Sequence, residues 1–179
     1  MNELGSQSSS YIISQAAEGN GNAGQVSVTT TGLLKISEGG SINASTFAQG
    51  DAGRVIVNAG QLEINAHNSE MRASIASQTA QGSTGNSGEV LVTVPGLLKL
   101  LDGGSIDTAT FSSKNAGKVI VNAGQLEIDE HGANLSTSIS SQATDKSTGN
   151  AGEVFVSVTG LLKLLGGGTI DSFTFSSGN

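Results

Sequence analysis

The sequence predicts an all-β fold, a right-handed parallel β-helix (β-solenoid) with three short strands per coil. A turn rich in Gly, Ser and Asn recurs along the 179 residues, with its last glycine at Gly24, Gly53, Gly88, Gly117 and Gly152. The spacings alternate, 29, 35, 29 and 35 residues, so the full repeat is a pair of coils. No window shows a sustained 3.6-residue apolar stripe, and short alternating segments with β-branched residues fill each unit instead.

Three apolar segments follow one another in every unit. The first is Val-x-Val, at 26–28, 55–57, 90–92, 119–121 and 154–156. The second is Leu-x-Ile/Leu, at 34–36, 62–64, 98–100, 126–128 and 162–164. The third begins at an isolated isoleucine: Ile42, Ile75, Ile106, Ile139 and Ile170. Each segment alternates with period 2 and is bounded by turn residues, which is typical of a short strand.

A single unit cannot bury its own apolar edge, so the units are expected to stack about 4.8 Å apart, each pairing with the next. Parallel strands joined by crossovers favour a right-handed winding. The sequence therefore predicts one β-helix segment over 1–179. We divide it into a partial coil 1–23 and coils 24–52, 53–87, 88–116, 117–151 and 152–179.

Composition excludes several classes of function. Eight basic against fifteen acidic side chains give a net charge of −7, which argues against a nucleic-acid partner. The chain has no cysteine, so disulfides and zinc-thiolate sites are excluded. No apolar run approaches the roughly 18 residues of a membrane helix, so we expect no membrane-spanning segment. The first ten residues lack the pattern of a signal peptide, and any export signal is expected outside this chain.

One unit per coil also predicts rows of charged side chains along the stack. The lysine–glutamate ladder lies between the two apolar positions of the second segment and alternates in sign: Lys35, Glu63, Lys99, Glu127 and Lys163. The turn-proximal ladder directly follows the turn glycine and alternates as well: Arg54, Glu89, Lys118 and Glu153. Opposite charges on facing positions favour pairing. Exposed pairs contribute only about 0.2–1 kcal/mol each, so we interpret both ladders as devices that fix register.

The turn carries a third row, the turn ladder, made of Asn22, Asp51, Asn86, Asn115 and Asn150. Stacked amides can form hydrogen bonds along the axis of such a stack. Asn and Asp also tolerate a left-handed turn conformation. Both explanations are structural, and neither predicts a binding site.

The repeat style resembles that of a known family. The motifs Gly-Asn-Ala-Gly-x-Val-x-Val, Gly-x-Leu-x-Ile/Leu, Gly-Gly-Ser-Ile and Ser-Thr-Phe, which together cover about residues 12–179, resemble the shaft repeats of filamentous-haemagglutinin-like exoproteins of two-partner secretion. The resemblance implies a secreted or bacterial cell-surface β-helix used in adhesion. It also implies export in an unfolded state through a partner outer-membrane transporter.

One departure from that family decides which part of such a protein this chain resembles. The family's secretion domain carries Asn-Pro-Asn-type motifs, whereas the single proline here is Pro95, in Val94-Pro95-Gly96. The chain therefore resembles shaft rather than secretion domain. We expect a non-catalytic structural segment whose partners are the rest of a parent exoprotein, that transporter, and further copies or a cell-surface ligand.

Two other functional classes stay open as alternatives. A polysaccharide-active β-helix enzyme needs converging carboxylates, and we expect Asp107 and Asp171 to be kept apart by a long coil with Ile139 between them. An ice-binding solenoid needs an unbroken threonine row. Thr46, Thr110 and Thr174 recur only in the short coils, and we expect Gln or Ser at comparable positions of the long ones.

No cofactor or metal site is expected from the remaining motifs. His67 and His131 occupy equivalent places in the long coils, too far apart to share a metal ion, and a solvated loop explains them better. The Gly-rich segment 82–88 lacks the lysine and the helix of a phosphate-binding loop.

The middle residue of the first segment predicts a surface feature. Strict alternation turns it outward, so an apolar stripe is expected at Ile56, Leu91, Ile120 and Phe155, between a charge ladder and a row of Thr, Asn and Ser. Either the chain's own longer segments cover this stripe, or it is a contact surface for side-by-side association of rods.

Overall fold

The computed structural model describes residues 10–67, 70–145 and 147–175. These residues contain strands and turns but no helix. The twelve strands are β1 (Tyr11–Ile13), β2 (Val26–Ser37), β3 (Ser41–Asn43), β4 (Val55–Asn65), β5 (Ala73–Thr79), β6 (Glu89–Leu101), β7 (Gly104–Thr110), β8 (Lys118–Asp129), β9 (Ser138–Ala143), β10 (Glu153–Val158), β11 (Leu162–Leu165) and β12 (Thr169–Thr174).

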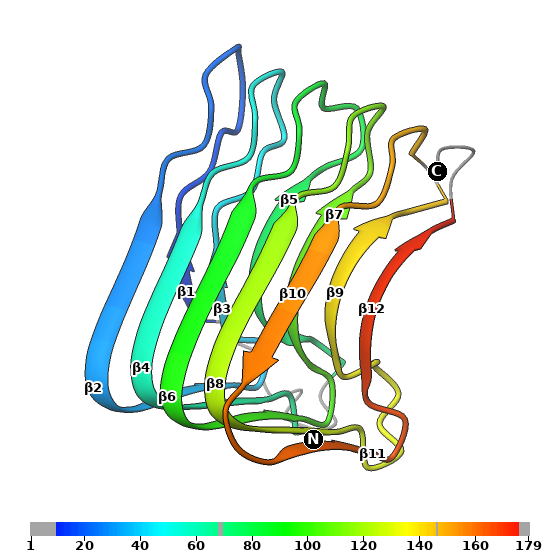
Figure 1. Cartoon of the computed structure of the whole chain (residues 1–179). Helices are drawn as coiled ribbons and strands as arrows, with labels where there is room; N and C mark the ends of the chain where they lie inside the picture. The colour runs from blue at the N-terminus through cyan, green and yellow to red at the C-terminus, as the bar shows by residue number, and fades with distance from the viewer. Residues whose placement is uncertain (1–9, 68–69, 146, 176–179) are drawn as a thin grey trace, which may run out of the picture.

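The strands form two parallel sheets that face each other across the core. One, the front sheet, has the order β10-β8-β6-β4-β2, with β11 also paired to β8, and the other, the back sheet, has the order β1-β3-β5-β7-β9-β12. Figure 1 shows the front strands running down and the back strands running up while the chain advances from left to right, which is a right-handed winding. The predicted right-handed parallel β-helix is confirmed.

The first two apolar segments differ from the prediction in one respect, because they are joined. β2, β4, β6 and β8 are single strands of 11 to 13 residues that contain both segments, and only the last coil separates them, as β10 and β11. Their pairing shifts register between the segments, for example between Thr30 and Leu33. The strand therefore bends without ending.

At the bends that follow another coil, a glycine stands where the neighbouring coil approaches too closely for a side chain. A Cβ added to Gly60 would lie 2.0 Å from the carbonyl oxygen of Thr31, and one added to Gly124 would lie 2.0 Å from that of Pro95. Pro95 occupies this irregular position in β6, where the ladder is already interrupted and its missing N–H costs little.

The inward positions of the inner coils are aliphatic and fully buried, as the alternation predicts. Val55, Val57, Leu62, Ile64 and Ile75 are at most 1% exposed. Each aliphatic type stacks on its equivalent in the next coil, since Val55 pairs with Val90, Leu62 with Leu98 and Ile75 with Ile106. The interfaces between coils therefore build the core.

A serine inside the long coils holds the third segment to the turn. The hydroxyl of Ser77 donates to the carbonyl of Gly53 at 2.8 Å and accepts from the N–H of Gly88 at 3.1 Å. Ser141, two coils on, makes the same pair of bonds with Gly117 and Gly152, at 2.9 and 3.0 Å. Each hydroxyl thereby pairs a carbonyl and an N–H of two successive turns.

Candidate functional site

The lysine–glutamate ladder lies on the outer face of the front sheet, with each member paired in register to the next. Nζ of Lys35 lies 2.9 Å from Oε1 of Glu63, and Nζ of Lys99 lies 3.5 Å from Oε1 of Glu127. Lys163 approaches the other oxygen of Glu127 at 3.9 Å. The side chains are between 23% and 49% exposed, so solvent screens them and each pair contributes little to stability.

The turn-proximal ladder runs beside the turns on the same face. Nη2 of Arg54 lies 2.8 Å from Oε1 of Glu89, and Nζ of Lys118 lies 3.4 Å from Oε2 of Glu153. Lys118 is paired in register with Glu89 on one side and Glu153 on the other. Its ammonium also stands 4.2 Å from the ring centroid of Phe155, within the range of a cation–π contact.

The turn ladder uses a hydrogen bond that neither sequence interpretation foresaw. The side-chain oxygen of one coil accepts from the backbone N–H of the same position in the next coil: Asn22 from Asp51 at 2.8 Å, Asp51 from Asn86 at 2.7 Å, and Asn115 from Asn150 at 3.0 Å. One contact between side chains accompanies these, from Nδ2 of Asn86 to Asp51 at 3.2 Å. None of the five, all within the described residues, has a positive φ, so the left-handed explanation is wrong here.

Positive φ occurs instead at the corner that follows the second segment. The non-glycine residues with positive φ in the described chain are Glu38, His67, Asp102 and His131, at 51°, 53°, 49° and 48°. They occupy equivalent corners of successive coils and alternate between acid and imidazole. The sequence predicts equivalent places for the two histidines, and the structure adds Glu38 and Asp102 to the same row.

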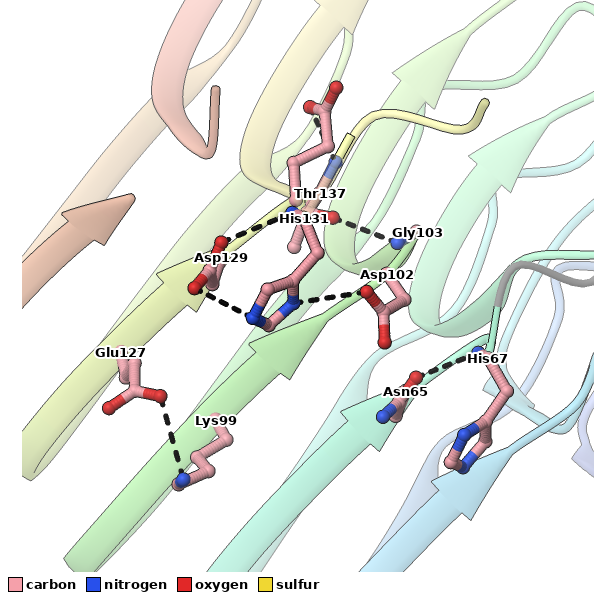
Figure 2. Close-up of polar contacts among 10 residues, drawn as sticks. Asn65, His67, Lys99, Asp102, Gly103, Glu127, Asp129, His131 and Thr137 are labelled. Carbon is pink, nitrogen blue, oxygen red and sulfur yellow. Dashed lines mark hydrogen bonds and ion pairs between the residues drawn. The ribbon is translucent and has the colours of Figure 1, made fainter. Parts of the chain in front are cut away.

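Figure 2 shows how this corner is held at His131. Nδ1 of the imidazole lies 3.1 Å from Oδ1 of Asp102, in the preceding coil, and Nε2 lies 3.0 Å from Oδ2 of Asp129. The backbone N–H of His131 donates to the other oxygen of Asp129 at 3.1 Å. At the equivalent corner, the N–H of His67 donates to Oδ1 of Asn65 at 2.7 Å. A polar residue two positions earlier thus closes both turns.

These contacts do not make a metal site. Within residues 10–67, 70–145 and 147–175, no group of three or more His, Cys, Asp or Glu side chains is placed to hold a metal ion. Both histidines are exposed. The same described part of the chain has no helix that could cross a bilayer.

The apolar stripe is continuous on the outer face of the front sheet. Ile56 pairs in register with Leu91, Leu91 with Ile120, and Ile120 with Phe155. The three aliphatic members are partly buried by their neighbours, and Phe155 is 49% exposed. Of the longer segments, residues 66, 67, 70–72 and 130–137 lie at the corner between the sheets, and no described segment crosses the stripe in Figure 1. The described residues of these segments therefore do not cover the stripe.

Two carboxylates of the back sheet, those of Asp107 and Asp171, form an acidic row whose neighbours differ from the prediction. Asp107 and Asp171 both pair with Ser140 of β9, whereas Ile139 pairs with Ile106 and Ile170 in the core. The two carboxylates therefore lie in one outward row, about two strand spacings or 9.6 Å apart. Oδ1 of Asp171 is buried and, among the described residues, has no hydrogen-bond partner.

Asp107 is 8% exposed, although it faces outward. Its carboxylate accepts from the amide of Gln78 and, at 2.9 Å, from the hydroxyl of Ser105. Burial raises the pKa of this carboxyl above its ordinary value, and the two hydrogen bonds and the charge of Arg72 offset only part of that rise.

The threonine row is internal. Thr46, Thr79 and Thr110 are fully buried and are paired in register, with Ala143 and then Thr174 following. The comparable positions of the long coils are therefore Thr79 and Ala143 rather than Gln or Ser. This row offers no surface to ice.

Comparison with models of known protein families, with curated proteins and with solved structures finds no match to this chain.

Proposed function

We propose that this chain is a non-catalytic structural shaft segment of a filamentous, adhesin-like exoprotein that is secreted or held at the bacterial cell surface. One observation carries the proposal: every coil stacks on the next in the same way. Val55 pairs with Val26 on one side and Val90 on the other, and Val119 and Val154 continue the row. A stack whose interfaces repeat the same strand pairing extends by addition of coils, each adding about 4.8 Å.

A catalytic role is less well supported by the acidic residues of the back sheet. General acid and base chemistry needs two groups that reach the same bond. Asp107 and Asp171 stand two coils apart with Ser140 between them, and Asp107 already accepts hydrogen bonds from Gln78 and Ser105. These bonds fit a structural carboxyl.

Export through an outer-membrane transporter partner is part of the proposal, as the resemblance to two-partner secretion implies. The sequence has no cysteine and a net charge of −7. No disulfide has to form or break during passage in an unfolded state, and folding can follow coil by coil outside the cell, because each coil contacts only its neighbours.

The test is the mass of the native polypeptide in culture supernatant, detected with an antibody against residues of this chain. A secreted product far larger than 17.8 kDa, lost when the partner transporter is deleted, is expected. A stable secreted species of 17.8 kDa, or retention inside the cell in the presence of the transporter, contradicts the proposal.

A second role, lateral association of rods, is favoured by the apolar stripe. Four large apolar side chains form one uninterrupted row on the outer face of the front sheet, with the turn-proximal ladder on one flank and a row of Asn, Thr and Ser on the other. An apolar patch rimmed by polar residues is typical of a contact surface. Two rods joined along this row would each bury the stripe over several coils.

A further inference from the structure

The back sheet presents a second, different row along its outer face. The residue that follows the third segment is aromatic in the short coils and small in the long ones. Together these residues form the aromatic row: Phe47, Ala80, Phe111, Thr144 and Phe175. Its register is set by the bridges and strands just before it, Thr46 with Thr79, Thr79 with Thr110, and Ala143 with Thr174. Phe47 is 55% exposed and Phe175 69% exposed, and Phe111 is half-buried.

The small residues leave a gap between consecutive rings. A hollow of about 280 Å³ lies over Ala80 and is lined by Phe47, Phe111, Gln78 and Ser45, among others. Equivalent positions two coils apart are about 9.6 Å apart along the axis. The aromatic wall therefore repeats with the period of a coil pair, and a hollow separates the first two rings.

The floor beside the aromatic row is polar and ordered. Ser105, Asp107 and Ser140 face away from the core, because they alternate with Ile106 and Ile139, yet they are at most 8% exposed. Neighbouring side chains therefore cover these three groups, Gln78 among them through its hydrogen bond to Asp107. The hydroxyl of Ser105 donates to Asp107 at 2.9 Å.

Two glutamines stand on this floor at equivalent places of the long coils. The amide nitrogen of Gln78 donates to Asp107, and that of Gln142 donates to the hydroxyl of Ser140 at 2.9 Å. These bonds fix the orientation of both amides. The glutamines alternate along the axis with the rings of the aromatic row, so each coil pair offers one ring and one oriented amide.

We propose that this face binds an extended, uncharged glycan that lies along the rod axis, with sugar rings on Phe47 and Phe111 and sugar hydroxyls toward Gln78 and Gln142. A pyranose has an apolar face of C–H groups and a rim of hydroxyls, which is the chemistry that aromatic walls and fixed amides complement. The period of a coil pair is comparable with the disaccharide repeat of an extended β-1,4-linked chain. Successive disaccharides can therefore meet equivalent groups.

Charge favours an uncharged glycan over an acidic one. The same face carries Asp107 and Asp171, and the whole chain has a net charge of −7. A polyanionic chain laid along this row would meet like charge at Asp107 and again two coils on at Asp171. Glycan binding and the shaft role are independent proposals, because the strand pairing that builds the rod is the same whether or not this face binds a glycan.

The test measures binding of soluble hexasaccharides of β-1,4-linked glucose, xylose and N-acetylglucosamine by titration calorimetry, with hexagalacturonate as the acidic comparison. At least one neutral hexasaccharide is expected to bind more tightly than hexagalacturonate. The double variant Phe47→Ala/Phe111→Ala should weaken that binding by about tenfold or more, because it removes both stacking surfaces.

The matched control is Phe155→Ala, which removes an exposed phenylalanine from the opposite sheet and should leave glycan affinity unchanged. Circular dichroism and the melting temperature report whether each variant folds. If the double variant does not fold, Phe47→Ala alone removes the more exposed ring, and its affinity decides the matter.

Three results overturn the proposal. They are failure of all three neutral hexasaccharides to bind, equal loss of affinity in Phe155→Ala, and full affinity in a folded Phe47→Ala/Phe111→Ala variant. Self-association of the native chain that the double variant abolishes, without glycan binding, would assign the face to contact between copies. None of these results bears on the secreted mass that tests the shaft role.

Discussion

Reversing one charge in the lysine–glutamate ladder tests whether the ladder fixes the stacking of coils. Glu63 is paired in register with Lys35 on one side and Lys99 on the other, and its carboxylate lies 2.9 Å from Nζ of Lys35. The substitution Glu63→Lys removes this ion pair. It also places three ammonium groups on adjacent strands.

The expected loss follows from the exposure of the partners. Lys35 and Glu63 are 49% and 25% exposed, so the lost pair contributes about 0.2–1 kcal/mol. Like charges on directly opposite positions destabilise by a similar amount. The free energy of unfolding should therefore fall by about 0.5–2 kcal/mol at low salt, or about 1–8 °C in melting temperature for a chain of this length.

The assay is urea denaturation followed by circular dichroism, at low salt and again at about 1 M salt, where the Debye length has fallen to about 3 Å. Most of the loss should disappear at high salt. Two variants separate the causes. Glu63→Gln removes the attraction without adding repulsion and should lose less, and Glu18→Lys makes the same change of net charge at an exposed turn residue outside the ladders.

The double variant Lys35→Glu/Glu63→Lys restores one opposite pair and should recover part of the lost stability. An unchanged denaturation midpoint for Glu63→Lys at low salt would refute the stacking energetics argued here. A loss that persists in full at 1 M salt would also refute them, since it would show that packing and not charge is responsible.

Three further predictions address the stripe, the turn and the buried carboxyl. Replacing Ile56, Leu91 and Ile120 together by Thr keeps β-propensity. The mass of the particle in solution should fall while the melting temperature is retained. A large fall in stability at constant mass would show that the stripe is core. Gly117→Ala places a Cβ 1.7 Å from the carbonyl oxygen of Gly88 and should destabilise strongly in thermal denaturation, whereas Gly21→Ala, with open space around it, should change little. Asp107→Asn should stabilise the protein at pH 7. A carboxyl whose pKa is raised in the folded state contributes stability below its unfolded pKa of about 3.8, and that stability is lost as pH rises through the folded value. The gain in melting temperature should therefore vanish near pH 3.5, and a gain that does not depend on pH would assign the effect to packing.

The fold was predictable because the repeat supplies the same information five times. Alternation within Val-x-Val and Leu-x-Ile/Leu sets the inward face, and the turn glycines set the coil length. A Cβ added at four of these turn glycines would lie 1.8 Å or less from the carbonyl oxygen of the preceding turn: Gly53, Gly88, Gly117 and Gly152. The spacing of these glycines therefore reported a real contact between coils.

The bend within the front strands was not predictable from alternation alone. Gly60 and Gly124 break the period-2 pattern, which is typical of a turn between two strands. In the structure, the pairing shifts register there and then resumes, so one strand continues around the corner. A glycine that permits close approach and a glycine that ends a strand look alike in a single sequence.

The acidic row was misplaced by one residue. Because side chains alternate faces, a shift of one position exchanges core and surface. Placing Ile139 rather than Ser140 between Asp107 and Asp171 therefore put a core residue where the structure has a surface hydroxyl. The third segment has only one strong apolar marker, its isoleucine, and one marker does not define the alternation that follows it.

The paired repeat is better suited to a long stack than a single repeat would be. If one set of coils slipped by a single coil against another, Lys35 would face Lys99 and Glu63 would face Glu127, and like charges directly opposite each other are destabilising. The same slip would bring coils of equal length together, so the short corners at Glu38 and Asp102 would face each other, and so would the long corners at His67 and His131. Identical coils would permit such slips without penalty, which makes parallel stacks prone to alternative pairings. Alternation in both charge and length therefore selects one register from sequences that are otherwise nearly the same.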